Sequence, residues 1–263
     1  MSDLCTLNES SETLDRINKE VRVMVSVAMA SYNGEKYIKE QIDSILANLD
    51  TNDELVISDD GSRDSTLDII RSFGDSRIKL IDGPHNGLVK NFENAVKHCT
   101  GDIIFLCDQD DMWYDGKVKK VCDKFADTDH ILIEHNAIVK DDSGNVLFPS
   151  FFAHRRVRTG VLKNMIRNTY HGCLIAFRAE LKEEMFPFPE KGCLHDQWIG
   201  LVAEMNGTTM FLDEILMDYR RHSGNASSFE HLPVSQQIKD RIALTGNVIR
   251  YKKNKRRKKL ANG

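Results

Sequence analysis

Short apolar runs alternate along the first half of the chain with segments whose apolar residues recur every three or four positions. The apolar runs lie at residues 21–30, 54–58, 78–81 and 102–107, and their content of valine, isoleucine and leucine is typical of buried strands. The segments between them have the spacing of amphipathic helices. This β-α-β-α-β-α-β order predicts a parallel sheet with helices on both faces.

The second half of the chain is less regular. Residues 131–139 and 146–152 resemble the two strands of a hairpin, because residues 141–145 between them have the composition of a turn. The other expected elements are strands at 170–177, 210–212 and 215–219, and helices at 117–125, at 194–205 and from about residue 234 onwards. A hairpin adds antiparallel pairs, so we expect a single α/β domain with one mixed sheet flanked by helices.

Polar and acidic residues follow three of the predicted parallel strands. The first strand leads into Ser31-Tyr32, the second into Asp59-Asp60 and the fourth into the acidic tetrad Asp108-Gln109-Asp110-Asp111. These strand ends should lie along one edge of the sheet, where open α/β sheets bind ligands. Carboxylates this close repel one another unless a cation lies between them, and hard divalent cations prefer oxygen ligands. The tetrad therefore indicates a metal site that holds a diphosphate; a solvated acidic turn is the alternative.

The composition is that of an ordinary soluble globular protein. The chain has 263 residues, of which 41% are hydrophobic and 29% charged, which is enough for one large domain. No run approaches the roughly 18 apolar residues of a membrane span. The six cysteines form no Cys-x-x-Cys pair, which favours a cytoplasmic location. Residues 1–20 are polar and acidic, so we expect a flexible leader there and not a signal peptide.

Charge is concentrated at the C-terminus. Residues 250–259 carry eight lysines or arginines and no acidic residue, although the net charge of the whole chain is −4. A basic tail on an acidic body indicates attraction to an anionic surface. The preceding helix contributes apolar residues beside this tail, which favours an anionic membrane surface over nucleic acid; a solubilising terminus is the alternative. These apolar residues are Ile238, Ile242, Leu244, Val248 and Ile249.

Five motifs occur in the order and spacing of a known family. They are residues 27–34, residues 57–62, Asn86-Gly87 with Asn91, the acidic tetrad, and residues 195–198 (His-Asp-Gln-Trp). Over about residues 22–225 the chain resembles the family 2 glycosyltransferases, which have the GT-A fold, a Rossmann-like nucleotide-sugar-binding fold. Within that family, the tetrad and the loop at 219–222 resemble most the bacterial rhamnosyltransferases of cell-wall and capsular polysaccharide synthesis.

This resemblance implies a function and a domain organisation. The enzyme would be an inverting glycosyltransferase that moves a sugar, rhamnose in the narrower match, from a nucleotide-diphosphate sugar to a hydroxyl of a saccharide or lipid-linked acceptor. Mg²⁺ or Mn²⁺ would bind at Asp108 and Asp110, with His222 as a further ligand, and Asp196 would be the general base. The transferase domain would cover residues 21–228, followed by a C-terminal helix and basic tail at 229–263. The protein would be cytoplasmic and peripheral to the inner membrane face.

The resemblance also assigns contacts to the donor and the acceptor. The donor nucleotide would contact Ala30, Tyr32, Asp60, Lys90, Asn91 and Asp108. Weaker assignments to the acceptor or a phosphate fall on Trp113, His195, Trp198, Arg220 and Arg221. For the donor residues, Tyr32 would stack on the base and Lys90 would meet a phosphate. The structural alternatives are a core aromatic residue for Tyr32, a solvated lysine for Lys90, a turn aspartate for Asp60 and a surface-loop histidine for His222. The family more often has glutamate where this chain has His195.

Two other functions compete with this interpretation. A sugar-phosphate nucleotidylyltransferase would carry a glycine-rich basic loop directly after the first strand, whereas residues 30–34 contain no basic residue. A non-catalytic nucleotide-sugar-binding subunit would not need Asp108, Asp110 and Asp196 together. An aspartyl phosphatase would place its Asp-x-Asp motif after the first strand rather than the fourth. The transferase is therefore the preferred hypothesis.

Overall fold

The computed structural model describes residues 23–222, 224–225 and 233–261. The expected leader at 1–20 and the expected boundary at 228/229 lie outside these residues. The first half contains β1 (Val25–Ser31), α2 (Ile38–Leu46), β2 (Glu54–Asp59), α3 (Thr66–Ser72), β3 (Ile78–Asp82), α4 (Leu88–His98) and β4 (Ile103–Cys107). The second half contains β5 (Met112–Trp113), α5 (Lys117–Ala126), β6 (His130–Asp141), β7 (Val146–Phe148), α6 (Phe151–Arg155), α7 (Val161–Ile166), β8 (Ile175–Arg178), α8 (Lys182–Met185), α9 (His195–Asn206), β9 (Thr208–Arg221) and α10 (Val234–Ala261).

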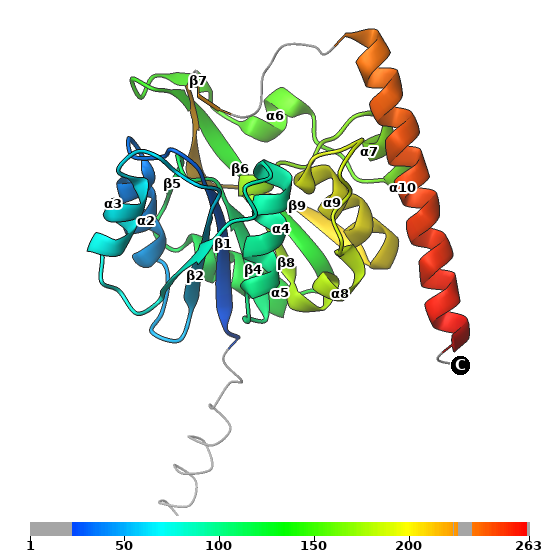
Figure 1. Ribbon diagram of the computed structural model, residues 1–263. Helices are drawn as coiled ribbons and strands as arrows, with labels where there is room; N and C mark the ends of the chain where they lie inside the picture. The colour runs from blue at the N-terminus through cyan, green and yellow to red at the C-terminus, as the bar shows by residue number, and fades with distance from the viewer. Residues whose placement is uncertain (1–22, 223, 226–232, 262–263) are drawn as a thin grey trace, which may run out of the picture.

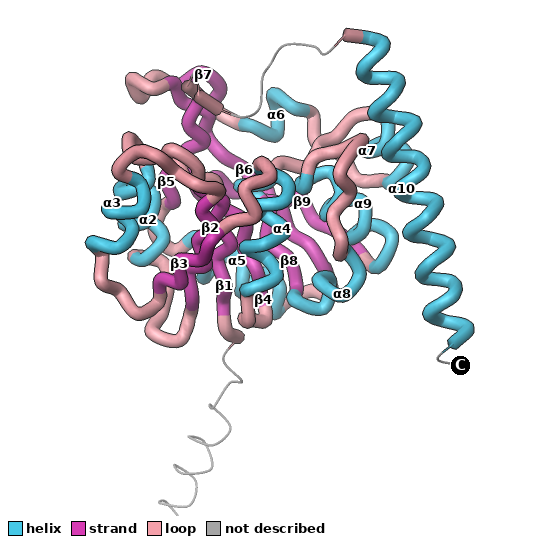
Figure 2. The backbone as a smooth tube through the Cα atoms, in the orientation of Figure 1, coloured by secondary structure: helices cyan, strands magenta, loops and turns pink. Residues whose placement is uncertain are grey.

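The described strands form one mixed sheet in the order β3-β2-β1-β4-β8-β6-β9-β5, with β7 paired to β6. Strands β1 to β4 are parallel, as the sequence predicted. Strand β8 is antiparallel to both β4 and β6, while β6 and β9 are parallel. Helices cover both faces of this sheet (Figures 1 and 2). The expected single α/β domain with a mixed sheet is confirmed.

Each face of the sheet has its own hydrophobic core, because successive side chains of a strand point to opposite faces. In β1, Val27 and Met29 pack with apolar residues of α2, α3 and α5. Ala28 and Ala30 pack on the other face with residues of α4, α9 and α10. The apolar residues that recur at helical spacing in α2 and α4 are therefore buried against the sheet.

The second half differs from the sequence prediction in several places. Of the strand expected at 146–152, only Val146–Phe148 pairs as a strand, because Ser150 caps α6 by accepting the Ala153 N–H at 3.2 Å. The short strands expected at 210–212 and 215–219 are one strand, β9, which pairs with β6 through register shifts around Asn136.

The strand expected at 170–177 is also shorter than predicted. Gly172–Leu174 forms a 3-10 turn, and the strand β8 begins only at Ile175. Helices α6, α7 and α8 and the two-residue strand β5 were not predicted.

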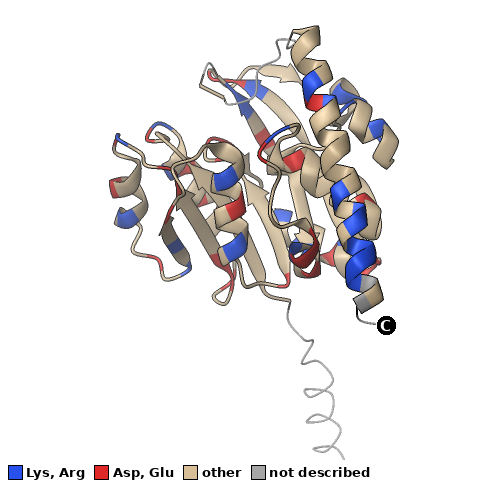
Figure 3. Ribbon diagram, turned by 45° about the vertical axis from the view of Figure 1, so that its right-hand side comes forward, with Lys and Arg blue, Asp and Glu red and all other residues tan. Residues whose placement is uncertain are grey.

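Helix α10 lies along the side of the domain near α7 (Figure 1). Leu244, Val248 and Tyr251 are buried against the second core, whereas Ile238 and Ile242 are exposed. Lysine and arginine follow one another along its C-terminal half (Figure 3). None of the described helices combines the length and the apolar composition that a membrane span needs.

Candidate functional site

The candidate site lies where β1, β2 and β4 end at the same edge of the sheet. Ser31 at the end of β1 is in register with Asp59 of β2, and Met29 is in register with Cys107, the last residue of β4. The acidic tetrad follows Cys107 directly. The parallel pairing therefore brings together the strand-end residues that the sequence placed at one edge.

Gln109 of the tetrad fixes the loop that follows β1. Its amide oxygen accepts the Tyr32 N–H at 3.0 Å and its amide nitrogen donates to the Tyr32 carbonyl at 3.1 Å. A Cβ atom at Gly34 would lie 2.3 Å from the Gln109 Oε1 atom, so this close approach requires glycine. The Tyr32 side chain is 53% exposed, which leaves its ring accessible to a ligand. The sequence analysis gave Gln109 no role.

Asp60 organises the loop that precedes α4. Its carboxylate accepts the N–H groups of Asn86 at 3.2 Å and Gly87 at 2.8 Å. Asn91 is buried and donates to the Ser31 carbonyl at 3.1 Å, while its Oδ1 atom has no partner among the described residues. The loops after β1, β2 and β3 are thus held together by side chains that the resemblance assigned to the nucleotide.

Lys90 has protein partners instead of a free ammonium group. Its Nζ atom lies 2.6 Å from Glu93 and 3.2 Å from the Phe188 carbonyl. Glu93 is also paired with Lys97 at 2.7 Å. A phosphate contact by Lys90 would require it to leave these partners.

The end of β9 is tied to the acidic tetrad. The His222 Nε2 atom lies 2.8 Å from a carboxylate oxygen of Asp110, and the Asn225 amide donates to the same oxygen at 3.2 Å. The Arg220 N–H donates to Asp111 at 3.0 Å. Two of the three residues predicted as metal ligands, Asp110 and His222, are therefore in direct contact although they come from distant parts of the chain.

Negative charge is crowded in the tetrad. Burial, followed by the charges of Asp110 and Asp196, raises the pKa of Asp108 to about 7. Burial, followed by the charges of Asp110 and Asp108, raises the pKa of Asp111 well above its usual value. A bound cation would relieve this repulsion.

The donor atoms present fit a divalent cation. Asp108, Asp110 and His222 offer carboxylate oxygens and an imidazole nitrogen, which suit Mg²⁺ and Mn²⁺. The buried Oδ2 atom of Asp111 has no hydrogen-bonding partner among the residues that the structure describes. Ligand atoms of Asp108, Asp111 and Cys173 also lie within 4.8 Å of one another.

Asp196 lies in the first turn of α9 and is only 7% exposed. The helix dipole by itself would lower its pKa. Burial outweighs the dipole and raises the pKa to about 6, even though the Gln197 N–H donates to the carboxylate at 2.6 Å. A carboxyl with this pKa accepts a proton near neutral pH, as a general base must. Its charge also raises the pKa of Asp108, which places the two carboxyls in one electrostatic environment.

Three residues assigned weakly to the acceptor are interior residues instead. Trp113 is 3% exposed and lies under the Lys117 ammonium, and Trp198 is 4% exposed and donates its indole N–H to the Met185 carbonyl at 2.8 Å. His195 stacks on Phe92 with the ring centroids 4.0 Å apart, and burial lowers its pKa to about 3. These side chains pack the core, so they offer no face to an acceptor sugar.

The two arginines near the end of β9 are held beside aromatic rings. The Arg220 guanidinium lies 5.0 Å from the centre of the Tyr37 ring and pairs with Glu40 at 2.9 Å. Arg221 donates to the Tyr219 hydroxyl at 3.0 Å. Tyr37 also stacks on His222 with the ring centroids 4.6 Å apart. The sequence analysis did not single out Tyr37, because the contact with His222 joins residues far apart in the chain.

The chain is similar to known glycosyltransferases in sequence. The model of "Glycosyl transferase family 2" matches residues 26–186, more than half of the chain. The chain is 27% identical over 224 residues to the Escherichia coli UDP-Glc:alpha-D-GlcNAc-diphosphoundecaprenol beta-1,3-glucosyltransferase WfgD, covering 81% of this chain and 83% of WfgD. It is 29% identical over 219 residues to the Shigella flexneri dTDP-rhamnosyl transferase RfbG, covering 75% and 72%.

Solved structures share the fold. S. aureus TarS in complex with UDP-GlcNAc superimposes with a TM-score of 0.67 at 21% identity, covering 82% of this chain and 64% of TarS 1–349. The Pyrobaculum calidifontis mannosyltransferase PcManGT in complex with GDP-Man and Mn²⁺ gives a TM-score of 0.59 at 22% identity, covering 75% and 57%. The chain thus spans less than two thirds of each solved chain. It belongs to glycosyl transferase family 2, and its fold is the GT-A fold.

Proposed function

We propose that the protein is a metal-dependent, inverting glycosyltransferase that moves a sugar from a nucleotide-diphosphate donor to a hydroxyl of a saccharide or lipid-linked acceptor. The observation that carries this proposal is the carboxyl of Asp196, buried at the start of α9 with its pKa raised to about 6 and electrostatically coupled to Asp108. This arrangement supports a proton acceptor beside a site for a diphosphate.

In the proposed reaction, Asp196 takes the proton of the acceptor hydroxyl while that oxygen attacks the anomeric carbon. The bond between this carbon and the diphosphate oxygen breaks, and its electrons leave with the diphosphate. Attack from the face opposite the leaving group inverts the anomeric centre. Asp108, Asp110 and His222 would hold Mg²⁺ or Mn²⁺, which when bound offsets the charge that develops on the diphosphate.

Ala30, Tyr32, Asp60 and Asn91 are the residues that we propose for the nucleotide. The exposed ring of Tyr32 supports stacking on the base, and Ala30 lies two residues before it, in the buried strand β1. The contacts of Asp60 and Asn91 support a second role, in which they shape the loops around the nucleotide. Rhamnose is the donor sugar that we propose, because RfbG is a dTDP-rhamnosyl transferase by name. WfgD is named for UDP-Glc, so glucose is the second candidate.

A screen of donor hydrolysis in the absence of acceptor tests this function. dTDP-rhamnose, UDP-glucose, UDP-GlcNAc and GDP-mannose are each incubated with the protein and Mn²⁺, and the released nucleoside diphosphate is measured. We expect slow hydrolysis of one donor, which EDTA or Asp110→Ala abolishes. A thermal shift with a donor, without hydrolysis of any donor, would indicate a non-catalytic binding subunit instead.

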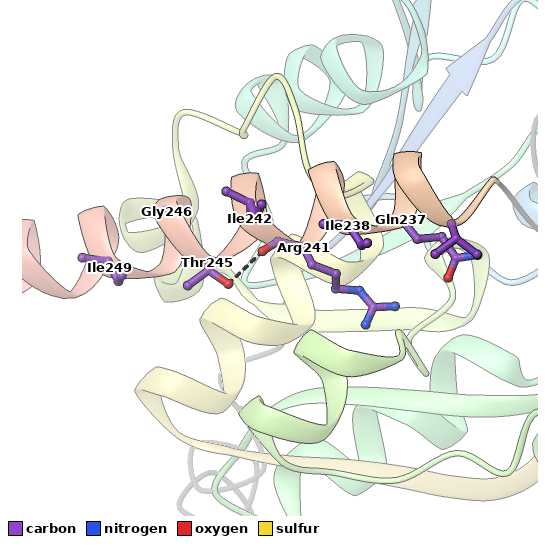
Figure 4. Close-up of a pocket in the computed structure, with 8 residues that line it drawn as sticks. Gln237, Ile238, Arg241, Ile242, Thr245, Gly246 and Ile249 are labelled. Carbon is purple, nitrogen blue, oxygen red and sulfur yellow. Dashed lines mark hydrogen bonds between the residues drawn. The ribbon is translucent and has the colours of Figure 1, made fainter.

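We further propose that α10 binds an anionic membrane surface. Val234, Ile238, Ile242 and Ile249 are exposed along one face of the helix, and Figure 4 shows the last three of them along α10. We call this row the α10 stripe. Leu244 and Val248, which the sequence analysis counted with these residues, face the body of the domain instead.

The charged residues next to the α10 stripe indicate which partner the stripe would bind. The helix continues from the stripe into a run of exposed basic residues: Lys252, Lys253, Arg256, Arg257 and Lys258. Apolar residues beside basic ones match the interface of an anionic bilayer. A lipid-linked acceptor, of the kind that the name of WfgD describes, would be presented at such a surface.

A further inference from the structure

Tyr37, the residue directly before α2, lies where three segments of the chain meet. Its hydroxyl donates to the carboxylate of Asp142, in the turn between β6 and β7, at 2.5 Å. Its ring stacks on the imidazole of His222, the residue directly after β9, with the ring centroids 4.6 Å apart and an angle of 25° between the planes. The side chain is only 9% exposed. One tyrosine from the first half of the domain therefore contacts the ends of both β6 and β9.

The pairing of β6 and β9 places these two contacts next to each other. The strands are parallel, and Asp141 of β6 is in register with Arg221 of β9, so Asp142 and His222 each follow one member of this pair. The turn after β6 is itself fixed, because the Asp141 carboxylate accepts the Asn145 N–H at 2.8 Å. The hydrogen-bonding partner of the tyrosine hydroxyl therefore has a defined position beside the end of β9.

The imidazole of His222 is held at its edge and at its face by different groups. At the edge, Nε2 lies 2.8 Å from a carboxylate oxygen of Asp110, and Nδ1 accepts the Gly224 N–H at 3.1 Å. Contacts at two ring nitrogens fix the edge of the ring but leave its tilt about the line between them. A stacked aromatic ring opposes that tilt. Tyr37 therefore supplies the restraint that the two edge contacts lack.

Tyr37 is anchored on the side of the acidic tetrad as well. Its N–H donates to the Gly34 carbonyl at 3.0 Å, and Gly34 lies against the Gln109 amide, where a Cβ atom would come within 2.3 Å of the amide oxygen. The guanidinium of Arg220 lies 5.0 Å from the centre of the tyrosine ring and pairs with Glu40 of α2 at 2.9 Å. The tyrosine ring is thus fixed relative to both sides of the site.

We propose that Tyr37 is a positioning residue that sets the tilt of the His222 ring beside Asp110. The hydrogen bond to Asp142 ties the tyrosine to the β6–β7 turn, and the stacked ring orients the imidazole. The consequence for a divalent ion rests on the proposed function. The lone pair of a ligating nitrogen lies in the plane of its ring, so an imidazole that can tilt holds an ion less tightly.

The first experiment records the histidine ring signals by NMR in EDTA, so that its outcome does not depend on a metal. Ring protons that lie over the face of an aromatic side chain are shifted upfield. His222→Gln identifies the His222 signal among the nine histidines. We expect this signal in the wild type and in Tyr37→Phe to lie upfield of its position in Tyr37→Leu. The same position in all three proteins would overturn the proposal. If Tyr37→Leu does not fold, Tyr37→Met replaces it.

The second experiment measures Mn²⁺ affinity by calorimetry without nucleotide. Tyr37→Phe and Tyr37→Leu both lose the hydrogen bond to Asp142, so the difference between them isolates the stacked ring. We expect Tyr37→Leu to bind Mn²⁺ about threefold to tenfold more weakly than the wild type, and Tyr37→Phe to stay within about twofold of it. Wild-type affinity in Tyr37→Leu, or an equal loss in both variants, would show that the ring does not position His222.

A shortened aromatic side chain elsewhere in the core is the matched control. Phe125→Leu at the end of α5 should lower the Tm and leave both the Mn²⁺ affinity and the His222 signal unchanged. An equal loss of Mn²⁺ affinity in Phe125→Leu would overturn the proposal, because general destabilisation would then explain the effect. A wild type that binds no Mn²⁺ contradicts the metal site of the proposed function, and the NMR comparison then still decides whether Tyr37 orients His222.

Discussion

His195 and Asp196 are neighbours in the chain, and burial moves their pKa values in opposite directions. It lowers the pKa of His195 to about 3 and raises that of Asp196 to about 6. Both shifts have one cause, because a low-dielectric interior favours the neutral form of either group. His195 is thereby a neutral ring stacked on Phe92, while Asp196 becomes a carboxyl that can exchange a proton near neutral pH.

Replacement of the proposed base tests its role directly. Asp196→Asn should reduce sugar transfer by a factor on the order of 10² to 10⁴, because the variant cannot accept the acceptor proton. The affinity for the nucleotide should be unchanged, since the proposed contact is with the acceptor. Steady-state kinetics and calorimetric titration with the nucleoside diphosphate check both expectations. Near-normal turnover of Asp196→Asn would rule the assignment out.

The raised pKa of Asp196 predicts a pH dependence. The base works only when ionised, so kcat/KM should rise with pH through about 6 and then level off. The folding stability that Asp196 contributes changes with pH in the opposite direction. The neutral carboxyl is the favoured form in the folded state, so its contribution to folding is complete below about pH 4 and is lost as pH rises through 6. A pH series of kcat/KM and of Tm measures both effects; a kcat/KM profile flat from pH 5 to 8 would contradict the first.

At the scale of elements, two helical glycines have opposite surroundings. A Cβ atom at Gly200 in α9 would lie 2.0 Å from the Tyr170 ring. The Tyr170 hydroxyl is itself held, because it donates a hydrogen bond to Glu204 and accepts one from Thr209. At Gly246 in α10, a Cβ atom would meet nothing within 4 Å. Helix α9 therefore depends on the missing side chain to approach Tyr170, whereas α10 does not depend on it.

Glycine-to-alanine substitutions at these two positions should therefore change the stability of the protein in opposite directions. Gly200→Ala should destabilise the protein by about 1–3 kcal/mol, because the core has no room for the added methyl group. Gly246→Ala should stabilise it by about 0.5–1 kcal/mol, because alanine is the better helix former. Urea denaturation of the two variants and the wild type makes the comparison. If both substitutions were stabilising, the contact between α9 and Tyr170 could not be as close as described.

At the scale of the whole molecule, α10 joins the domain to the anionic membrane surface that we propose it binds. Tyr251 lies within the basic segment and is buried, and its hydroxyl accepts a hydrogen bond from Asn206 at 2.6 Å and donates to Glu184 at 2.9 Å. Deleting residues 250–263 would remove this contact together with the charge. Substitutions of the exposed basic residues in this segment remove the charge and keep the Tyr251 contact, so they separate the two effects.

Replacing Lys252, Lys253, Arg256 and Arg257 by glutamine should release the protein from anionic vesicles. Each basic residue near such a surface contributes about 1 kcal/mol, and salt screens the attraction. Co-sedimentation with vesicles containing phosphatidylserine, at low and high salt, measures the binding. Donor hydrolysis should be unchanged, and Lys119→Gln with Lys124→Gln in α5 is the control for loss of positive charge elsewhere. Equal sedimentation of the glutamine variant and the wild type at low salt would leave the basic segment as a solubilising feature.

Much of the fold and part of the site followed from local patterns. The strands β1 to β4 and the helices between them have clear periodicity, and parallel pairing follows from their alternation. The five family motifs led to the acidic tetrad and Asp196, and the resemblance of the loop at 219–222 led to His222. The structure also brings Asp110 and His222 into contact, as expected for two ligands of one ion.

The sequence by itself therefore determined the order of the elements in the first half of the chain, the sheet edge that carries the site and the family. Only the tertiary structure decided which aromatic residues are buried, that β9 is one strand, and which face of α10 packs on the domain. It also decided that Lys117 is buried against the Trp113 ring. Periodicity and turn chemistry act between residues near in sequence, whereas burial and charge pairing depend on residues that meet only in the fold; Asp110 and His222 are 112 positions apart.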